Sequence, residues 1–235
     1  VQKLKSCPVL MYRVQLILYS TSCKGRMIIM QNTVRENLLQ IQEDIAPCKP
    51  NIIAVTKYFD ENAMIEAYKA GLRDFAESRA IEAVEKIENL PAEVRNNSRF
   101  HFIGHLQTNK VKKVVPIFDY IHSVDSFKLA KTISDEANAI GKVQNILLQV
   151  NNANEEQKFG FSKTNIFEEF PLIKELPSVN IAGIMNMAPL GASEEELNRL
   201  FEDVSNIKKE LEQKFNCELK ELSMGMSQDY KIAVR

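Results

Sequence analysis

Residues 51–71 read NIIAVTKYFDENAMIEAYKAG, and this stretch decides the fold class. Its first seven residues are mostly apolar and β-branched, which is typical of a strand buried on both faces. Asp60 can cap the helix that follows, and we expect that helix to end at Gly71. A strand followed directly by a helix is the repeating unit of a parallel sheet covered by helices.

The same unit recurs on both sides of this stretch. An amphipathic helix opens at Thr33, where Thr-Val-Arg-Glu has the form of a capping box. Further strands are predicted at residues 73–77, 100–104, 120–124, 145–150, 181–186 and 218–223. Further helices are predicted at residues 79–90, 108–115, 126–140, 164–176 and 194–215. These alternations indicate an α/β protein, either an open doubly wound sheet or a closed barrel.

Two features favour a TIM (β/α)8-type barrel. The sequence contains neither GxGxxG nor GxxxxGK, so a nucleotide-binding sheet would lack its usual phosphate cradle. Polar residues follow one strand after another, and in a barrel these strand ends meet at the mouth where active sites lie. They are Lys57, Glu77, Ser78, His101, Gly104, His105, Ser123, Asn151, Asn186 and residues 223–227.

Composition narrows the function classes. The 235 residues suffice for one large core, and the net charge of −1 offers no general attraction for nucleic acid or an anionic membrane. We therefore expect neither as a partner. The four cysteines form no CxxC pair and the three histidines lack zinc-ligand spacing with them. A reducing cytoplasmic location is the expectation.

The first 29 residues differ from the rest. They carry five basic and no acidic residues, hence +5, and the remaining 25 basic and 31 acidic residues give −6 for residues 30–235. The apolar run at residues 9–19 contains Arg13 and is too short to span a membrane. No small-residue cleavage site follows it. We interpret Met30 as the natural start, residues 1–29 as an extension outside the fold, and residues 30–235 as the barrel domain.

Lys57 is the strongest candidate for chemistry. A lysine that ends so apolar a strand either reaches past the sheet rim into water or lies in a partly dry pocket. Desolvation would favour the neutral amine, which can condense with an aldehyde to give an imine. An aldehyde cofactor would fit the second alternative.

The turn Ser223-Met224-Gly225-Met226-Ser227 could hold a phosphate through its backbone N–H groups and the Ser227 hydroxyl. The alternative is an ordinary strand-to-helix loop in which Ser227 caps a helix beginning near Gln228. Met224 and Met226 could pack against a flat ring or simply fill the end of a barrel.

Three strings resemble the pyridoxal phosphate homeostasis protein family, which is similar to the N-terminal domain of alanine racemase. They are AVTK at residues 54–57, HFIGHLQTNK at 101–110 and SMGMSQDYKIAV at 223–234. The likeness covers residues 34–235. It implies that Lys57 carries pyridoxal 5'-phosphate as an internal aldimine and that Ser227 binds its phosphate. It also implies a carrier that keeps free cofactor in check, without established turnover.

Two positions depart from the family pattern. Ser78 replaces an asparagine that would lie near the cofactor, and Asn186 replaces a threonine at the end of the sixth predicted strand. We predict Ser78, Asn186, Met224, Gly225 and Met226 as cofactor-binding residues beside Lys57 and Ser227.

His101 admits two interpretations. It alternates with Phe100 and Phe102, so it is either a hydrogen-bonded core histidine or a cofactor-binding residue at the mouth. Lys158, by its match to a family loop, is expected at the mouth as well. Lys110, Lys112 and Lys113 are expected on a solvated helix face.

The family pattern continues beyond SMGMSQDYKIAVR into an eighth strand that this sequence lacks. Without it, the first and seventh predicted strands would expose unpaired backbone groups. One hypothesis is that the natural chain is longer. The other is that residues 9–19 form a surrogate strand in the gap.

Two other functional classes stay open. One is a pyridoxal phosphate-dependent amino-acid racemase or decarboxylase, although the chain has no room for the β domain that supplies the second base of a racemase. The other is a Schiff-base aldolase without a cofactor. For the carrier, we expect pyridoxal phosphate-dependent apoenzymes as possible recipients and a monomer as the working unit.

Overall fold

A computed structural model describes residues 10–12, 33–153 and 159–235, which form one parallel sheet with helices around it. The sheet order follows the chain from β1 to β8, and every neighbouring pair is parallel. The strands are β1 (Leu10–Tyr12), β2 (Ile52–Val55), β3 (Asp74–Glu77), β4 (Arg99–Phe102), β5 (Tyr120–Val124), β6 (Gln144–Val150), β7 (Val179–Asn186) and β8 (Glu221–Ser223). The predicted α/β class and barrel-type architecture are confirmed.

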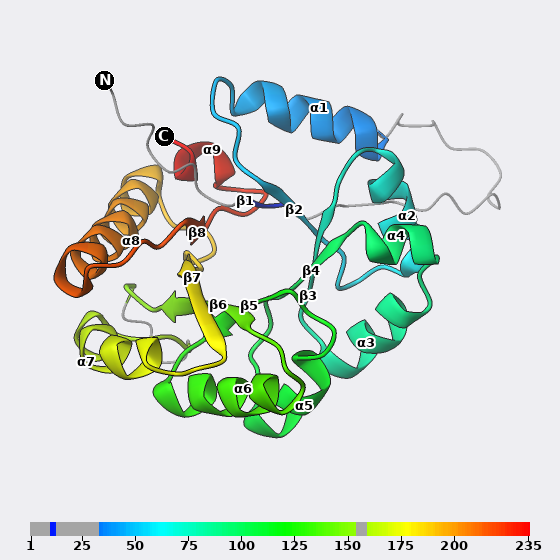
Figure 1. Cartoon of the computed structure of the whole chain (residues 1–235). Helices are drawn as coiled ribbons and strands as arrows, with labels where there is room; N and C mark the ends of the chain where they lie inside the picture. The colour runs from blue at the N-terminus through cyan, green and yellow to red at the C-terminus, as the bar shows by residue number, and fades with distance from the viewer. Residues whose placement is uncertain (1–9, 13–32, 154–158) are drawn as a thin grey trace, which may run out of the picture.

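The helices surround the strands, as Figure 1 shows in a view with the strands at the centre. They are α1 (Val34–Asp44), α2 (Glu61–Lys69), α3 (Ala80–Glu88), α4 (Ala92–Asn96), α5 (Val111–Val114), α6 (Phe127–Ala139), α7 (Lys163–Lys174), α8 (Glu194–Phe215) and α9 (Tyr230–Ala233). None of the described helices is long and apolar enough to cross a membrane.

Capping side chains start several helices where the sequence predicts them. Thr33 and Glu36 form the expected capping box, and the Asp60 carboxylate accepts the Ala63 N–H at 3.3 Å. The prediction is less accurate at residues 108–115, where a 3-10 turn at Thr108–Lys110 precedes the one-turn helix α5. The short helix α4 is also additional to the predicted elements.

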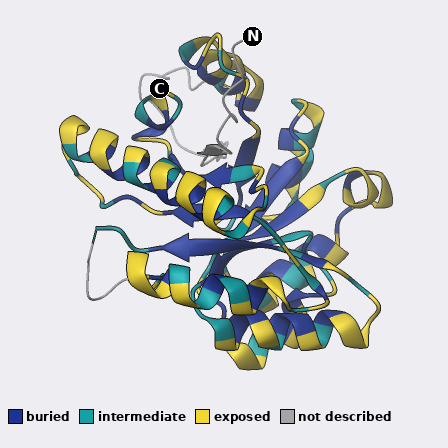
Figure 2. Cartoon of the chain, turned by 60° about the vertical axis from the view of Figure 1, so that its left-hand side comes forward, coloured by how far each residue is buried: buried dark blue, intermediate teal, exposed yellow. Residues whose placement is uncertain are grey.

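The core has two layers because side chains alternate across each strand. On β2, Ile52 and Ala54 belong to the large cluster beneath the helices, whereas Ile53 and Val55 belong to a smaller cluster with Met185. All four residues of β2 are buried, in agreement with a strand covered on both faces. Figure 2 shows this pattern, with buried strands inside and exposed helix faces outside.

The strand β1 was not among the strands predicted for the barrel domain. Leu10–Tyr12 pairs with β2 on the side away from β3, and it also contacts α9. These three residues therefore take part in the sheet, although the sequence analysis left residues 1–29 out of the fold. They lie within the 9–19 segment considered as a surrogate strand, and the rest of that segment is outside the described residues. No strand follows β8 within residues 159–235.

Candidate functional site

The carboxyl ends of β2 to β8 lie along one edge of the sheet because all of these strands are parallel. Lys57 follows β2, and Ser78 follows the neighbouring strand β3. On the other side, Asn186 ends β7, while residues 223–227 follow or end the neighbouring strand β8. The topology thus places most of the predicted site residues on the same edge.

A buried ion pair ties down the chain next to Lys57. The Glu77 carboxylate accepts the Thr56 hydroxyl at 2.7 Å and lies 2.7 Å from Lys86 Nζ. Lys86 Nζ also donates to the Thr56 carbonyl at 2.9 Å. The Glu77 side chain is only 2 % exposed, so its charge is buried and its ion pair and hydrogen bond lie inside the protein. This network joins β2, β3 and α3 and fixes the residue that precedes Lys57.

The Lys57 side chain is half-buried, and its amine makes no ion pair with a described residue. Its Nζ lies 5.3 Å from the centroid of the Tyr58 ring. The Arg79 guanidinium lies 5.9 Å from the same ring. Lys57 therefore presents an amine at the edge of the sheet that is not occupied by a carboxylate from the described part of the chain.

Residues 223–227 lead from the end of β8 into a hydrogen-bonded turn at residues 227–229, and one carboxylate holds this connection. Gly225 has φ +86°, a conformation that side chains disfavour. The Met226 N–H donates to Asp229 Oδ1, and the Met226 carbonyl accepts the Tyr230 N–H at 2.9 Å. Burial raises the pKa of the Asp229 carboxyl. Ser227 is exposed, while Met224 and Gly225 are buried and Met226 is half-buried.

Ser227 does not cap a helix, which was the alternative role considered for it. The helix after the turn is α9, and Asp229 is its N-cap residue, two positions beyond Ser227. The Ser227 hydroxyl is therefore not used to begin a helix. Asp229 was not singled out from the sequence, and its side chain accepts the Met226 N–H rather than capping the helix.

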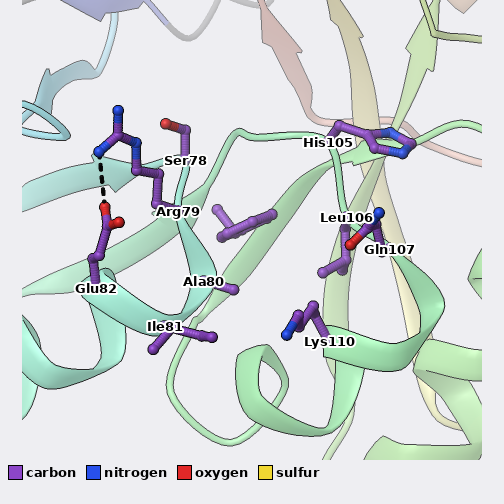
Figure 3. Close-up of a pocket in the computed structure, with 10 residues that line it drawn as sticks. Ser78, Arg79, Ala80, Ile81, Glu82, His105, Leu106, Gln107 and Lys110 are labelled. Atoms are coloured by element: carbon purple, nitrogen blue, oxygen red, sulfur yellow. Dashed lines mark hydrogen bonds and ion pairs between the residues drawn. The ribbon is translucent and has the colours of Figure 1, made fainter.

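Ser78 lies on one wall of a pocket of about 230 Å³ between the loops that follow β3 and β4. Figure 3 shows Ser78 and Arg79 on one side, facing His105, Gln107 and Lys110 on the other. The two loops approach closely, because a Cβ on Gly104 would lie 2.1 Å from the Ser78 carbonyl oxygen. Glycine is required there by contact rather than by backbone conformation.

Asn186 is buried at the end of β7 and retains an unused acceptor. Its Nδ2 donates to the Val150 carbonyl at 3.2 Å and to Asn152 Oδ1 at 2.8 Å. Its Oδ1 has no hydrogen-bond partner among the described residues, and the same is true of the buried Ser123 Oγ. An unpaired buried acceptor is costly, so a site for a donor group is the simplest account of it.

His101 occupies the interior of the sheet rather than its edge. Its Nε2 lies 2.8 Å from Asp74 Oδ1, and its Nδ1 lies 2.9 Å from His122 Nε2. Its ring stacks on Tyr120 at a centroid distance of 4.9 Å. Both ring nitrogens are engaged with protein groups, so His101 is a hydrogen-bonded core histidine, as the first interpretation expects. A contact between His101 and a cofactor stays a prediction.

Three groups of residues in or near the site were not identified from the sequence. They are the ion-pair partner Lys86, the turn-holding Asp229, and the buried residues Asp74 and His122, each of which contacts His101. The only available signal for Asp74 and His122 was a polar residue inside an apolar strand, which does not reveal its partner. Lys110 lines the pocket, whereas Lys112 and Lys113 are exposed as predicted. Lys158 lies outside the described residues.

Comparisons with known proteins agree on one family. Residues 29–233 match the model of the alanine racemase N-terminal domain. A pyridoxal phosphate homeostasis protein of Synechocystis sp. is 39% identical over 194 residues, covering 82% of this chain and 88% of that protein. A protein of the same description from Schizosaccharomyces pombe is 30% identical, covering 83% and 82%.

Solved structures extend the comparison. The structure of PipY from Synechococcus elongatus PCC7942 with PLP bound has a TM-score of 0.76 and 36% identity, covering 86% of this chain and 92% of that one. Alanine racemase of Clostridium difficile has a TM-score of 0.67 at 13% identity, covering 82% of this chain and 52% of that one. The latter likeness concerns the fold alone.

Proposed function

This chain belongs to the alanine racemase N-terminal domain family and to the pyridoxal phosphate homeostasis proteins, and we propose that it binds pyridoxal 5'-phosphate covalently through Lys57. The bond would join the aldehyde carbon of the cofactor to Lys57 Nζ as a carbon–nitrogen double bond, with release of water. The observation that carries the proposal is the position of the Lys57 amine on the same sheet edge as the Gly225 turn. The PLP-bound structure of the relative PipY supports it.

The residues present fit the chemical groups of this cofactor. When bound, the cofactor supplies an aldehyde for an amine, a phosphate dianion and an aromatic ring. Lys57 offers an amine without a described ion-pair partner, which suits the aldehyde. Residues 223–227 offer a glycine turn and the exposed Ser227 hydroxyl, which suit the phosphate. The unpaired Asn186 Oδ1 offers an acceptor for a donor group.

The surrounding residues have supporting roles in this proposal. The Glu77 and Lys86 pair holds the backbone before Lys57, so the amine is presented from a rigid strand end. Asp229 holds Met226, which fixes the shape of the turn that would receive the phosphate. Met224 and Met226 flank Gly225 and would pack near the cofactor. Ser78, with its shorter side chain, would contact the cofactor from the β3 loop.

We propose a carrier role in intracellular pyridoxal phosphate homeostasis, and relatives named pyridoxal phosphate homeostasis proteins support the homeostasis part of this proposal. Apoenzymes that need the cofactor would be its recipients, and a monomer would be the working unit. A cytoplasmic location is part of this proposal.

The test loads the full chain with pyridoxal 5'-phosphate, reduces it with borohydride and maps the labelled peptide. The label is expected on Lys57, and Lys57→Ala should abolish both the label and the visible absorption of the loaded protein. Lys110→Ala is the matched control, because Lys110 lies at the same edge of the sheet and lines the neighbouring pocket. A label on another residue, or none, would refute the proposal.

A second assay separates the carrier from the enzyme. The loaded chain is incubated with single enantiomers of amino acids, and racemisation and decarboxylation are both followed. No conversion is expected above that of free cofactor. Turnover that disappears in Lys57→Ala would instead favour a racemase or decarboxylase.

A further inference from the structure

A chain of buried polar side chains crosses the interior of the sheet. Asp74 Oδ1 lies 2.8 Å from His101 Nε2, and His101 Nδ1 lies 2.9 Å from His122 Nε2. His122 Nδ1 then lies 2.8 Å from Ser223 Oγ. These residues come from β3, β4, β5 and β8, and none is more than 3 % exposed. We call these four residues the interior chain.

The interior chain links the far side of the sheet to the turn at residues 223–227. Ser223 is both the last residue of β8 and the first residue of that turn. At the other end, Asp74 is the first residue of β3, and its Oδ2 accepts from Arg99 at 2.7 Å. A change in protonation near Asp74 can therefore be passed to the turn through two imidazole rings.

Counting hydrogen atoms shows that the hydrogen bonds of the interior chain have two self-consistent arrangements. An ionised Asp74 only accepts, so His101 must donate through Nε2. If His101 is neutral, its Nδ1 accepts from His122 Nε2–H, and His122 Nδ1 must accept from the Ser223 hydroxyl. In this first arrangement every hydrogen bond points from Ser223 towards Asp74.

One additional proton reverses the direction of two of the three hydrogen bonds in the interior chain. If His101 carries a proton on both ring nitrogens, its Nδ1–H donates to His122 Nε2. His122 stays neutral, but its hydrogen must then be on Nδ1 and donate to Ser223 Oγ. The Ser223 hydroxyl, which no longer donates to His122, is free to donate in another direction. The hydroxyl at the start of the turn therefore differs between the two arrangements.

We propose that the interior chain is a proton-coupled switch in which His101 and His122 are positioning residues that set the hydroxyl direction of Ser223 and thereby the binding properties of residues 223–227. The consequence for pyridoxal phosphate rests on the proposed function. The reversal of the hydrogen bonds is a property of the interior chain and does not depend on the proposed function.

The surroundings favour a single added proton that resides on His101. Burial, followed by the charge of His101, lowers the pKa of His122 well below its ordinary value. Burial alone would raise the pKa of Asp74, but the hydrogen bonds from His101 and Arg99 outweigh it and lower that pKa. Asp74 is thus kept as an ionised partner for His101, while His122 is kept neutral.

Other charged and titratable groups also face His101. Tyr120 stacks on its ring, and Glu221 and Arg99 line the same small interior cavity. Burial raises the pKa of Glu221 and that of Tyr120. Asp74 is the described carboxylate within hydrogen-bond distance of a His101 ring nitrogen.

The decisive experiment is an NMR pH titration of the full chain, uniformly labelled with ¹⁵N so that both the histidine rings and the backbone amides are observed. The chain has only three histidines, and His105 lies outside the interior chain and is 40 % exposed, which makes it an internal reference. As the pH falls, His101 should become doubly protonated while His122 stays neutral and moves its hydrogen from Nε2 to Nδ1. The backbone amide signals of Gly225 and Met226 should change with the same midpoint.

Two carboxylate variants provide a matched comparison. Asp74→Asn should lower the pH midpoint of the reversal, because it removes the anion next to His101. Asp125→Asn should leave that midpoint unchanged and affect only His105, from which Asp125 lies 3.7 Å. Protonation of His122 before His101, or an unchanged His122 tautomer while His101 titrates, would overturn the switch.

A binding measurement tests whether the reversal of the hydrogen bonds changes the affinity for the cofactor. The Kd of pyridoxal 5'-phosphate is measured against pH for the wild type and for Ser223→Ala, with circular dichroism as a check that the variant folds. The wild-type Kd should change with the midpoint found by NMR, and that change should be absent in Ser223→Ala. An equal pH dependence in both proteins would refute the positioning role. If neither protein binds the cofactor, the proposed function fails, while the NMR titration still decides the reversal.

Discussion

The two ends of the candidate site are held in different ways. At Lys57, side chains from β2, β3 and α3 meet in a buried ion-pair network. At residues 223–227, the turn is held by its backbone, by the Gly225 conformation and by Asp229. Long-range contacts hold the first end. Local contacts hold residues 225–227 of the second end, and a long-range hydrogen bond to His122 holds only Ser223 at its start. The stability of the protein and its ligand binding should therefore respond differently to substitutions at the two ends.

The largest effect is expected from Glu77→Ala. It leaves Lys86 as a buried charge without its carboxylate, which should lower the free energy of unfolding by about 3 to 5 kcal/mol. Urea denaturation followed by circular dichroism measures this change. Glu82→Ala is the control, because its ion pair with Arg79 is exposed on both sides and should cost no more than about 1 kcal/mol.

The double variant Glu77→Leu with Lys86→Met sharpens this result. Replacing both partners by apolar residues removes the unpaired charge and should recover much of the lost stability. If the double variant were as unstable as Glu77→Ala, the ion pair would not be the reason for the loss.

A smaller loss is expected from Gly104→Ala, between the two ends of the site. The new methyl group would meet the Ser78 carbonyl oxygen at 2.1 Å, so the β3 and β4 loops must move apart. Overpacking of this kind costs about 1 to 3 kcal/mol. A thermal melt should show the loss, and unchanged stability would mean that the two loops separate freely.

Gly225→Ala should separate stability from binding. A side chain at φ +86° costs about 1 to 2 kcal/mol, and the strain is confined to the turn. We expect a modest drop in the melting temperature together with a much larger rise in the Kd of pyridoxal 5'-phosphate. Gly71→Ala, with φ +106° and no neighbour within 4 Å of the added carbon, should show the same drop without the effect on Kd. Equal Kd values in the two variants would argue against the turn as the binding element.

The smallest effect is expected from Asp229→Asn. Burial raises the pKa of Asp229, so the folded state binds its proton more tightly than the unfolded chain does. The ionised carboxylate therefore opposes folding, and this cost grows as the pH rises above the ordinary value of 3.8. The Asn variant keeps an oxygen for the Met226 N–H but has no charge. Relative to the wild type, it should gain less than about 1 kcal/mol between pH 4 and 7. Chemical denaturation across that range measures the difference, and a loss at neutral pH would contradict this account.

Local sequence patterns predicted most of the elements. The Thr33 capping box, the Asp60 cap and the apolar run before Lys57 each depend on residues a few positions apart, and each is present in the structure. The pattern failed at residues 108–115, where a 3-10 turn replaces the first part of the predicted helix. At Leu10–Tyr12 the sequence offered a surrogate strand only as one of two hypotheses, because a strand of three residues has no periodicity to read.

By itself, the sequence determined which segments become parallel strands, and hence that Lys57 and residues 223–227 share one edge of a sheet. Only the tertiary structure decided which polar groups meet inside it. Glu77 finds Thr56 at a distance of 21 residues along the chain, and His122 finds Ser223 at a distance of 101 residues. Hydrophobic periodicity encodes which face of a strand is buried, but it does not say which polar side chains of distant strands will meet. The partners of buried charges therefore emerge only when the sheet is assembled.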